Sequence, residues 1–195
     1  MKALLTVSVL LMVVSVNAIG QGGKASSQTF LVRVVDAQLL TRAAAGPINM
    51  RNCLVVLPDG RMELELFRQE FFGSADVKSY TGRLNERELQ ILLSKLNDPS
   101  IQNLSEFVAP KPALRGDEFH TFIVDMSGTG SLRSVGFFEW KGDGPTNADE
   151  QKRNWESAKV ALQPLLEWSQ WAKSDGHTAH WVPLHRIPAS CSGRD

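Results

Sequence analysis

The stretch from Cys53 to Asn97 constrains the fold most, because strand-like and helix-like patterns follow one another in it. An apolar run at 52–57 ends in Pro58-Asp59-Gly60, which is typical of a tight turn. Beyond the turn, Glu63 and Glu65 alternate with apolar residues, the period-two pattern of a strand with one wet face and one buried face. Another strand is expected over 77–81. These residues predict a β-hairpin and a third strand.

The helix that follows is marked at both ends. Asn85 is a favourable N-cap, and Glu88 lies three residues later, where its carboxylate can reach back to the cap. Leucines at 89, 92, 93 and 96 form one apolar stripe, and Pro99 ends the helix. Burying four leucines stabilises the fold by roughly 6–12 kcal/mol before entropy, whereas a cap contributes about 1 kcal/mol. Packing therefore decides whether this helix forms, and the cap decides where it starts.

A looser version of the same plan is expected between Phe119 and Trp171. Strands are predicted over 119–126 and 132–140, and Asn147 with Glu150 repeats the cap-plus-glutamate signature at the start of a second helix. Pro164 is expected to kink this helix or to divide it in two. With an earlier strand over 29–35, the sequence predicts an α+β fold. We expect a mostly antiparallel sheet of about five to seven strands, with two main amphipathic helices packed on one face and the strands-then-helix plan occurring twice.

The first 18 residues are expected to be a signal peptide. Lys2 precedes an almost wholly apolar run, and Ala18 supplies a small residue at a cleavage site. An uncleaved anchor is the alternative, but the apolar run is short for a span of ~20 residues. We expect a flexible leader over 19–28 and a single domain over 29–195, with a first half over about 29–108, a second half over about 113–175 and a tail over 176–195. The protein is therefore expected to be secreted or periplasmic, with no stable membrane insertion after cleavage.

The charge balance argues against polyanionic partners. The chain holds 21 basic and 21 acidic residues, so its formal net charge is zero. A surface of this kind provides no electrostatic footprint for nucleic acid or for an anionic membrane.

The two cysteines, Cys53 and Cys191, both follow the predicted signal peptide. In an oxidising compartment we expect them to form one disulfide, which would tie the tail to the first hairpin strand. Closing so long a loop would stabilise the fold by about 5 kcal/mol in the chain-entropy model. The alternative is a pair of free thiols, with Cys53 a small buried hydrophobic residue.

Candidate catalytic residues gather around the predicted strand at 119–126. His120 lies near Asp117, Glu118 and Asp125 in the sequence, and such a set could perform acid–base chemistry. A salt bridge at the start of the strand is the plainer interpretation. No Ser-His-Asp order and no nucleophile elbow is present. The sequence therefore favours a protein without catalytic activity, and a secreted hydrolase that uses His120 with nearby carboxylates is the alternative.

Histidines crowd the C-terminal tail, where His177, His180 and His185 lie within nine residues. Imidazoles at this density can bind zinc or copper, which makes metal binding a further alternative. The glycine and proline residues of the tail disfavour a helix that would bring two of them to one face. We therefore expect a solvated tail, no metal and no cofactor.

All five tryptophans follow residue 139. Trp155 fits the apolar stripe of the second predicted helix, whereas Trp168 and Trp171 lie off it. Together with Trp181 they could form an exposed aromatic surface for a partner or a glycan. Covering by a neighbouring part of the chain, such as 181–184, is the interpretation that we favour.

The run Asp59-Gly60-Arg61, followed by Tyr80-Thr81-Gly82-Arg83-Leu84 and a leucine-rich capped helix, resembles a layout in small exported bacterial proteins of unknown function. The resemblance covers residues 53–97, and it implies export and no particular activity. We therefore expect an exported, non-catalytic binding or envelope-associated protein, whose partner is an unknown protein or cell-surface ligand.

Overall fold

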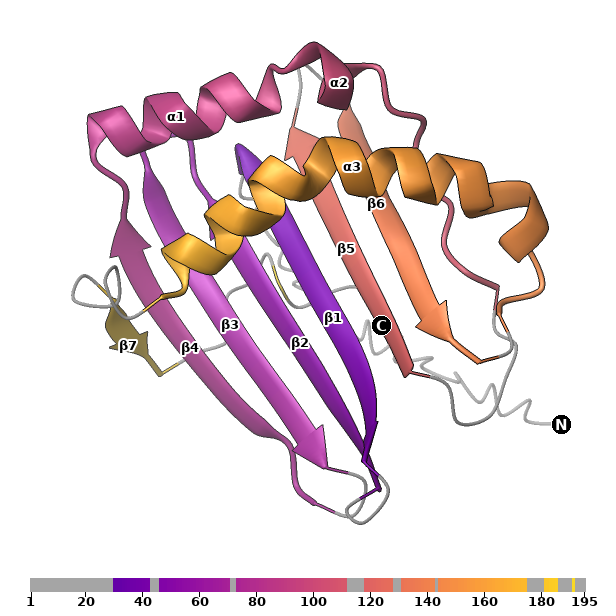
Figure 1. Ribbon diagram of the computed structural model, residues 1–195. Coiled ribbons are helices and arrows are strands. Elements are labelled where there is room, and N and C mark those ends of the chain that lie inside the picture. Colours follow the sequence, from indigo (N-terminus) through magenta and orange to yellow (C-terminus); the bar gives the residue numbers. More distant parts are fainter. Residues whose placement is uncertain are drawn as a thin grey trace, which may run out of the picture.

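The computed structural model describes residues 30–42, 46–70, 73–111, 118–127, 131–142, 144–174, 181–185 and 191. Seven strands among these residues form one antiparallel sheet in the order β6-β5-β1-β2-β3-β4-β7 (Figure 1). The strands are β1 (Val32–Arg42), β2 (Gly46–Val56), β3 (Arg61–Glu70), β4 (Asp76–Arg83), β5 (Glu118–Ser127), β6 (Leu132–Lys141) and β7 (Val182–Leu184). The helices are α1 (Glu86–Leu96), α2 (Pro99–Gln102) and α3 (Ala148–Ala172). The predicted α+β class with a mostly antiparallel sheet is confirmed.

The sheet combines strands from both parts of the chain. Strands β1 to β4 form a meander in which each strand pairs with the next. Strand β5 pairs with the other side of β1, from Val32 opposite Met126 to Leu39 opposite Phe119. Strand β6 lies outside β5, and the three-residue β7 lies outside β4. Two runs of strands, each followed by helix, therefore share one sheet.

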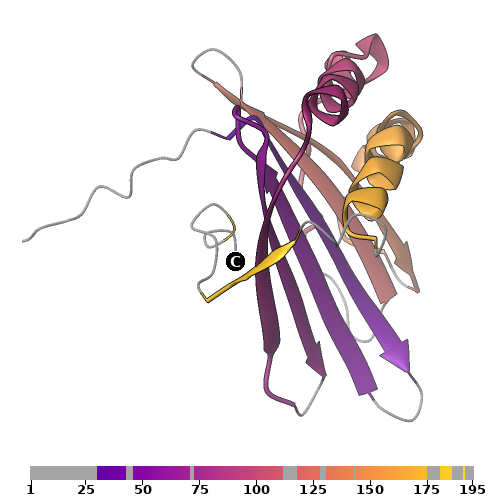
Figure 2. The ribbon, with the colours of Figure 1, turned by 90° about the vertical axis from the view of Figure 1, so that its left-hand side faces the viewer.

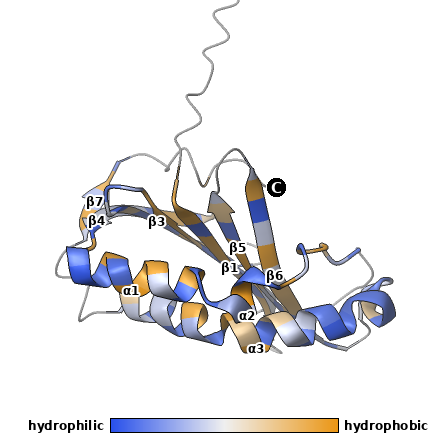
Figure 3. Cartoon of the chain, turned by 90° about the horizontal axis from the view of Figure 1, so that it is seen from above, coloured by the Kyte–Doolittle hydropathy of each residue, from blue (hydrophilic) through white to orange (hydrophobic). Residues whose placement is uncertain are grey.

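Helices α1 and α3 lie on the same side of the sheet (Figures 1 and 2), and the view from above shows them with α2 in one layer beside it (Figure 3). Alternate side chains of a strand point to one face, so the apolar positions of each strand meet the helix layer. The main core is built from Val32 and Val34 of β1, Leu54 and Val56 of β2, Met62 and Leu64 of β3, Phe122 and Val124 of β5, Val135 and Phe137 of β6, and from Leu92, Leu96, Ile101, Leu162 and Leu165 of the helices.

The start of α1 has the predicted capping box. Glu88 N donates to the Asn85 side chain at 2.9 Å, and Asn85 N donates to the Glu88 carboxylate at 2.7 Å. Leu92 is fully buried in the main core, whereas the neighbouring Ile91 is 45% exposed. The stripe and the cap thus coincide with the helix that the sequence predicts.

The start of α3 differs from its prediction. The Asn147 side chain makes no capping hydrogen bond. It accepts instead from Lys111 N at 2.9 Å and donates to Ala109 O at 3.1 Å. The prediction was wrong because the connector before β5 competes for this amide. The helix also continues through Pro164 as a single element of 25 residues, so it is not divided there.

The face of the sheet opposite the helices is partly covered, which corrects the predicted wet face of β3. The predicted disulfide joins Cys53 to Cys191, with the Cα atoms 6.0 Å apart, and both residues belong to a second small core with Val55 and Leu57. Glu63 and Glu65 lie on this face but are only 8% and 2% exposed. The alternation of charged and apolar residues identifies the strand. It carries no information about Cys191, which lies 138 residues after Cys53 in the sequence and binds to this face through the disulfide.

Within the described ranges, no helix is both long enough and apolar enough to cross a membrane.

Replacing Leu92 by alanine should lower the free energy of unfolding by about 2–5 kcal/mol, because the change leaves a cavity in the main core. The matched change Ile91→Ala, on the exposed side of the same turn, should cost about 0.5 kcal/mol or less. Urea unfolding of the two variants measures this difference. Equal losses would show that α1 is not held by packing of its stripe.

Candidate functional site

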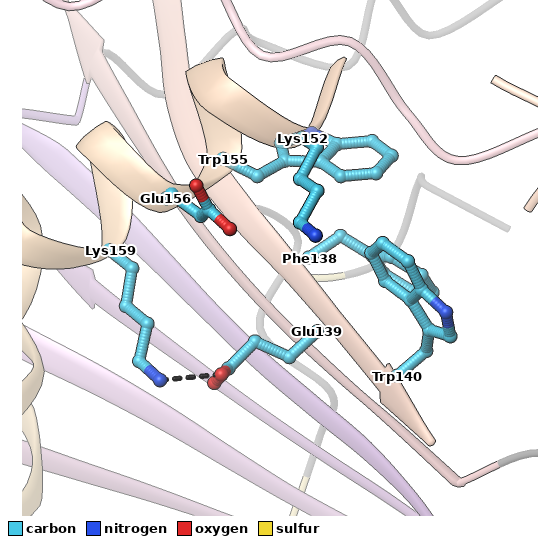
Figure 4. Close-up of a pocket in the computed structure, with 7 residues that line it drawn as sticks. All are labelled: Phe138, Glu139, Trp140, Lys152, Trp155, Glu156 and Lys159. Atoms are coloured by element: carbon cyan, nitrogen blue, oxygen red, sulfur yellow. Dashed lines mark hydrogen bonds and ion pairs between the residues drawn. The ribbon is translucent and has the colours of Figure 1, made fainter. Parts of the chain in front are cut away.

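A groove lies between the outer strand β6 and the first half of α3. Its first cavity has a volume of about 450 Å³, and its lining residues are drawn in Figure 4: Phe138, Glu139, Trp140, Lys152, Trp155, Glu156 and Lys159. A second cavity of about 280 Å³ shares Glu139 and Trp140 with the first and is also lined by Gln38, Leu40, Glu118, Phe119, His120 and Lys141. We call the two cavities together the β6–α3 groove. Volumes of this order are typical of sites for small ligands or short segments.

Packed aromatic rings form one wall of the groove. Phe138 stacks on Trp140 with ring centroids 5.8 Å apart, and Trp155 meets both rings edge-on at 5.4 and 6.0 Å. The Trp155 indole also donates to Val108 O at 3.2 Å, which fixes its orientation. The loop after β6 lies directly against the Trp140 ring, because a Cβ atom at Gly144 would lie 2.5 Å from the indole nitrogen. Rings held from several sides give the groove a rigid wall.

A series of hydrogen bonds and ion pairs crosses the inner side of the groove. Lys173 at the end of α3 donates to Asp36 of β1 at 3.1 Å, and Asp36 accepts from His120 Nε2 at 3.0 Å. His120 Nδ1 lies 3.7 Å from the Glu139 carboxylate, which also pairs with Lys159. This series links two points on α3 through three strands of the sheet, so it fixes the helix over the sheet as well as shaping the groove.

Among the three side chains Asp36, His120 and Glu139, Asp36 is the most deeply buried, with 6% of its surface exposed. Burial alone would raise its pKa, but the hydrogen bond from His120 and the charge and hydrogen bond of Lys173 outweigh that effect and lower the pKa below its ordinary value of 3.8. The folded state therefore favours the ionised form of Asp36.

Lys152 and Glu156 are the groove charges that no described residue neutralises. They lie one turn apart on α3, and their side chains extend into the first cavity in Figure 4. In the part of the chain that the structure describes, no hydrogen bond or ion pair engages either charged group. Glu118, by contrast, accepts from Lys141 at 2.8 Å, and this contact raises the pKa of the exposed Lys141 ammonium.

The structure brings together only part of the predicted acid–base set. His120 and Glu118 both line the groove, whereas Asp117 lies outside the described residues. Asp125 is fully buried elsewhere on β5, where it pairs with Arg33 at 2.8 Å and accepts from the Ser134 hydroxyl. Its alternation with His120 along the strand places the two side chains on opposite faces.

Sequence reasoning missed Asp36 and Glu139 as the partners of His120. The available signal is an aspartate within the mostly apolar stretch 31–40, because a buried carboxylate needs a partner. The His120–Asp36 pair resembles the base and its orienting acid in hydrolases. No hydroxyl or thiol group of the described residues hydrogen-bonds His120, so the pair has no adjacent nucleophile there.

The three tryptophans proposed as an aromatic surface lie in different environments. Trp168 is only 5% exposed and belongs to the main core, so it contributes to no exposed surface. Trp181 is partly buried, donates to Ala172 O at 3.0 Å and covers Gly82. Trp171 is 42% exposed. The three rings therefore do not form one exposed surface. The favoured interpretation, covering by a neighbouring part of the chain, applies to Trp168 and not to Trp171.

The candidate metal-binding histidines of the tail lie mostly outside the described residues. His177 and His180 lie outside the described residues, and His185 is exposed. Within the residues that the structure places, no three His, Cys, Asp or Glu side chains are grouped as metal ligands.

Fold and site together define an α+β protein with a single antiparallel sheet, a disulfide on one face, and a groove between the helix layer and an edge strand on the other. No family model, no curated protein and no solved structure matches this chain.

Replacing Asp36 by asparagine should destabilise the protein by about 1–3 kcal/mol at about pH 7, because Lys173 and His120 lose a charged acceptor. The wild-type advantage is complete above the unfolded pKa of 3.8 and is lost as the pH falls through the lower folded pKa. The two unfolding free energies should therefore converge in acid. Urea unfolding over a pH series measures this, with the exposed Asp149→Asn as control. A gap that does not depend on acid pH would contradict the assignment.

Proposed function

We propose that this protein is an exported, non-catalytic binding protein that holds a partner protein or cell-surface ligand in the β6–α3 groove. One observation carries the proposal. Lys152 and Glu156 extend into a cavity with a rigid aromatic wall, while the other charged groups of the groove are paired within the protein. The two charged groups can orient a ligand, and the aromatic wall beside them provides apolar surface that stabilises the bound ligand.

Export is supported by two independent features. The N-terminal residues have the pattern of a signal peptide, and Cys53 and Cys191 form a disulfide, a bond that persists mainly in oxidising compartments. Balanced charge agrees with a protein or neutral surface ligand rather than a nucleic acid.

The two main helices, which the sequence predicts to pack on a single face of the sheet, would hold the walls of the groove in place. Helix α3 forms one wall of the groove and also contributes Leu162 and Leu165 to the core. A wall built on a packed helix holds its side chains more precisely than a loop does.

A secreted hydrolase is the second candidate, because His120 lines the groove and Asp36 orients its ring. This function requires a nucleophile or an activated water on the Nδ1 side of the imidazole, where the Glu139 carboxylate lies 3.7 Å away. Hydrolysis of a groove ligand that is lost in His120→Gln but kept in Lys152→Ala would favour it over simple binding.

Export predicts the mass of the processed protein. Expressed in full in a bacterial host, the chain should be recovered outside the cytoplasm without residues 1–18 and with two hydrogen atoms fewer than the reduced form. Intact-mass spectrometry before and after reduction measures both changes. Full-length protein in the cytoplasmic fraction would contradict export.

Ligand binding predicts a selective thermal shift. Screening against peptidoglycan fragments, glycans and peptides should identify a stabilising ligand, and Lys152→Ala or Glu156→Ala should weaken its binding by about tenfold or more, the value of one charge-assisted hydrogen bond. Both side chains are exposed, so the variants should unfold at nearly the wild-type temperature. The matched change Glu167→Ala, on α3 outside the groove, should leave binding unchanged. If none of the three substitutions changes the affinity of the ligand, the binding site lies outside the groove.

A further inference from the structure

The outer edge of β6 offers backbone groups of known direction. Strand β6 is an edge strand of the described sheet. One of its sides pairs with β5, and no strand pairs with the other side. Phe107 N donates to Ser134 O at 2.8 Å from outside the sheet. In an antiparallel strand the N–H and C=O of one residue point to the same side, and successive residues alternate. The backbone groups of Phe138 and Trp140 therefore point outward, as those of Ser134 do.

These outward groups lack partners in the described structure. The connector that begins at Phe107 leaves the edge, because the carbonyls of Val108 and Ala109 accept from the side chains of Trp155 and Asn147 on the α3 side. Outside the strand ladders, no hydrogen bond among the described residues engages the backbone N–H or C=O of Phe138 or Trp140. Within the ladder, β5 pairs with the backbone groups of the alternate residues of β6. Unpaired groups at strand spacing are a template for another strand.

The groove lies beside this part of β6. Phe138, Glu139 and Trp140 line its first cavity from the strand, while Lys152, Trp155 and Glu156 line it from α3 (Figure 4). The cavity thus has backbone donors and acceptors on one wall and one unpaired charge of each sign on the other. A peptide can satisfy both walls, with its backbone on β6 and its side chains toward α3.

From this juxtaposition we propose that an extended segment of a partner protein binds in the β6–α3 groove as an added β-strand, paired with the backbone of Phe138 and Trp140. The proposal rests on the binding function proposed above and names the chemical class of the ligand. Lys152 and Glu156 select an acidic and a basic side chain on the bound segment.

The opposite edge of the same sheet already contains a short added strand. Strand β7 has three residues, and it pairs with β4 from Ser79 opposite Leu184 to Thr81 opposite Val182. A short segment held by a few backbone hydrogen bonds and by adjacent side-chain contacts is therefore compatible with the twist of this sheet.

Other classes of ligand fit the groove less well than a peptide does. A neutral glycan would leave both Lys152 and Glu156 without a counter-charge, and a nucleic acid would meet no net positive surface.

Selection from a library of acetylated and amidated peptides of random sequence, with the purified full chain as bait, tests the proposal. A selected peptide is then resynthesised with single N-methyl groups at successive residues. Because alternate residues of a strand face β6, methylation should weaken binding by about tenfold or more at one alternating set of positions and little at the other. Hydrogen exchange followed by NMR should show the Phe138 and Trp140 amides slowed in the complex.

Two charge variants control for the register. Lys152→Glu and Glu156→Lys should exchange the preferred sign of charge at one position of the selected peptides, whereas Glu167→Lys should select the same sequences as the wild type. Binding that ignores N-methylation, or that leaves the Phe138 and Trp140 amides unchanged, would overturn strand addition. A glycan fragment that binds in the groove when no peptide does would also overturn it but would leave the binding function intact. Failure of every ligand class would remove both.

Discussion

The antiparallel pairing of β1 with β5 is the interaction on which the rest of the structure depends. It joins the meander β1–β4 to the β5–β6 hairpin, so that two runs of strands become one sheet with one apolar face. It also places Asp36 beside His120 and lets Lys173 reach Asp36 from the end of α3. Without this register, α3 would have no sheet wide enough to cover, and the groove would lose its inner side. A sheet in which buried side chains alternate with outward-facing ones tolerates no shift of one residue, which would reverse both faces.

How far the sequence predicts this structure depends on how far apart the interacting residues lie. The capping box at Asn85 is predicted correctly because all its atoms lie within four residues of one another. The same signature at Asn147 fails because the connector 36 residues earlier takes the side chain. Glu63 is buried on the face of the sheet that carries the disulfide, which joins residues 138 positions apart. The contact of His120 with Asp36 joins residues 84 positions apart. Local patterns thus predict the elements, whereas the candidate site consists of contacts that no local pattern encodes.

The charged residues of the groove fall into two groups with different physical roles. Asp36, Glu139 and Lys159 are paired within the protein and hold α3 over the sheet. Lys152 and Glu156 are exposed and contribute little to stability in the free protein, where water solvates them. The first group fixes the shape of the site, and the second is available to a ligand. This division explains how a groove can be rigid and still have charge left for recognition.

The separation of the two cysteines has a consequence for the order in which the chain can mature. A polypeptide that enters an oxidising compartment from its N-terminus presents Cys53 long before Cys191, which follows 138 residues later. Over that interval the thiol of Cys53 has no intramolecular partner, since the described residues contain no other cysteine. In a chain exported in this way, the disulfide can close only after β1 to β6 have been delivered. Until then the thiol is open to a mixed disulfide with an oxidoreductase, so maturation of this protein would depend on the redox enzymes of its compartment.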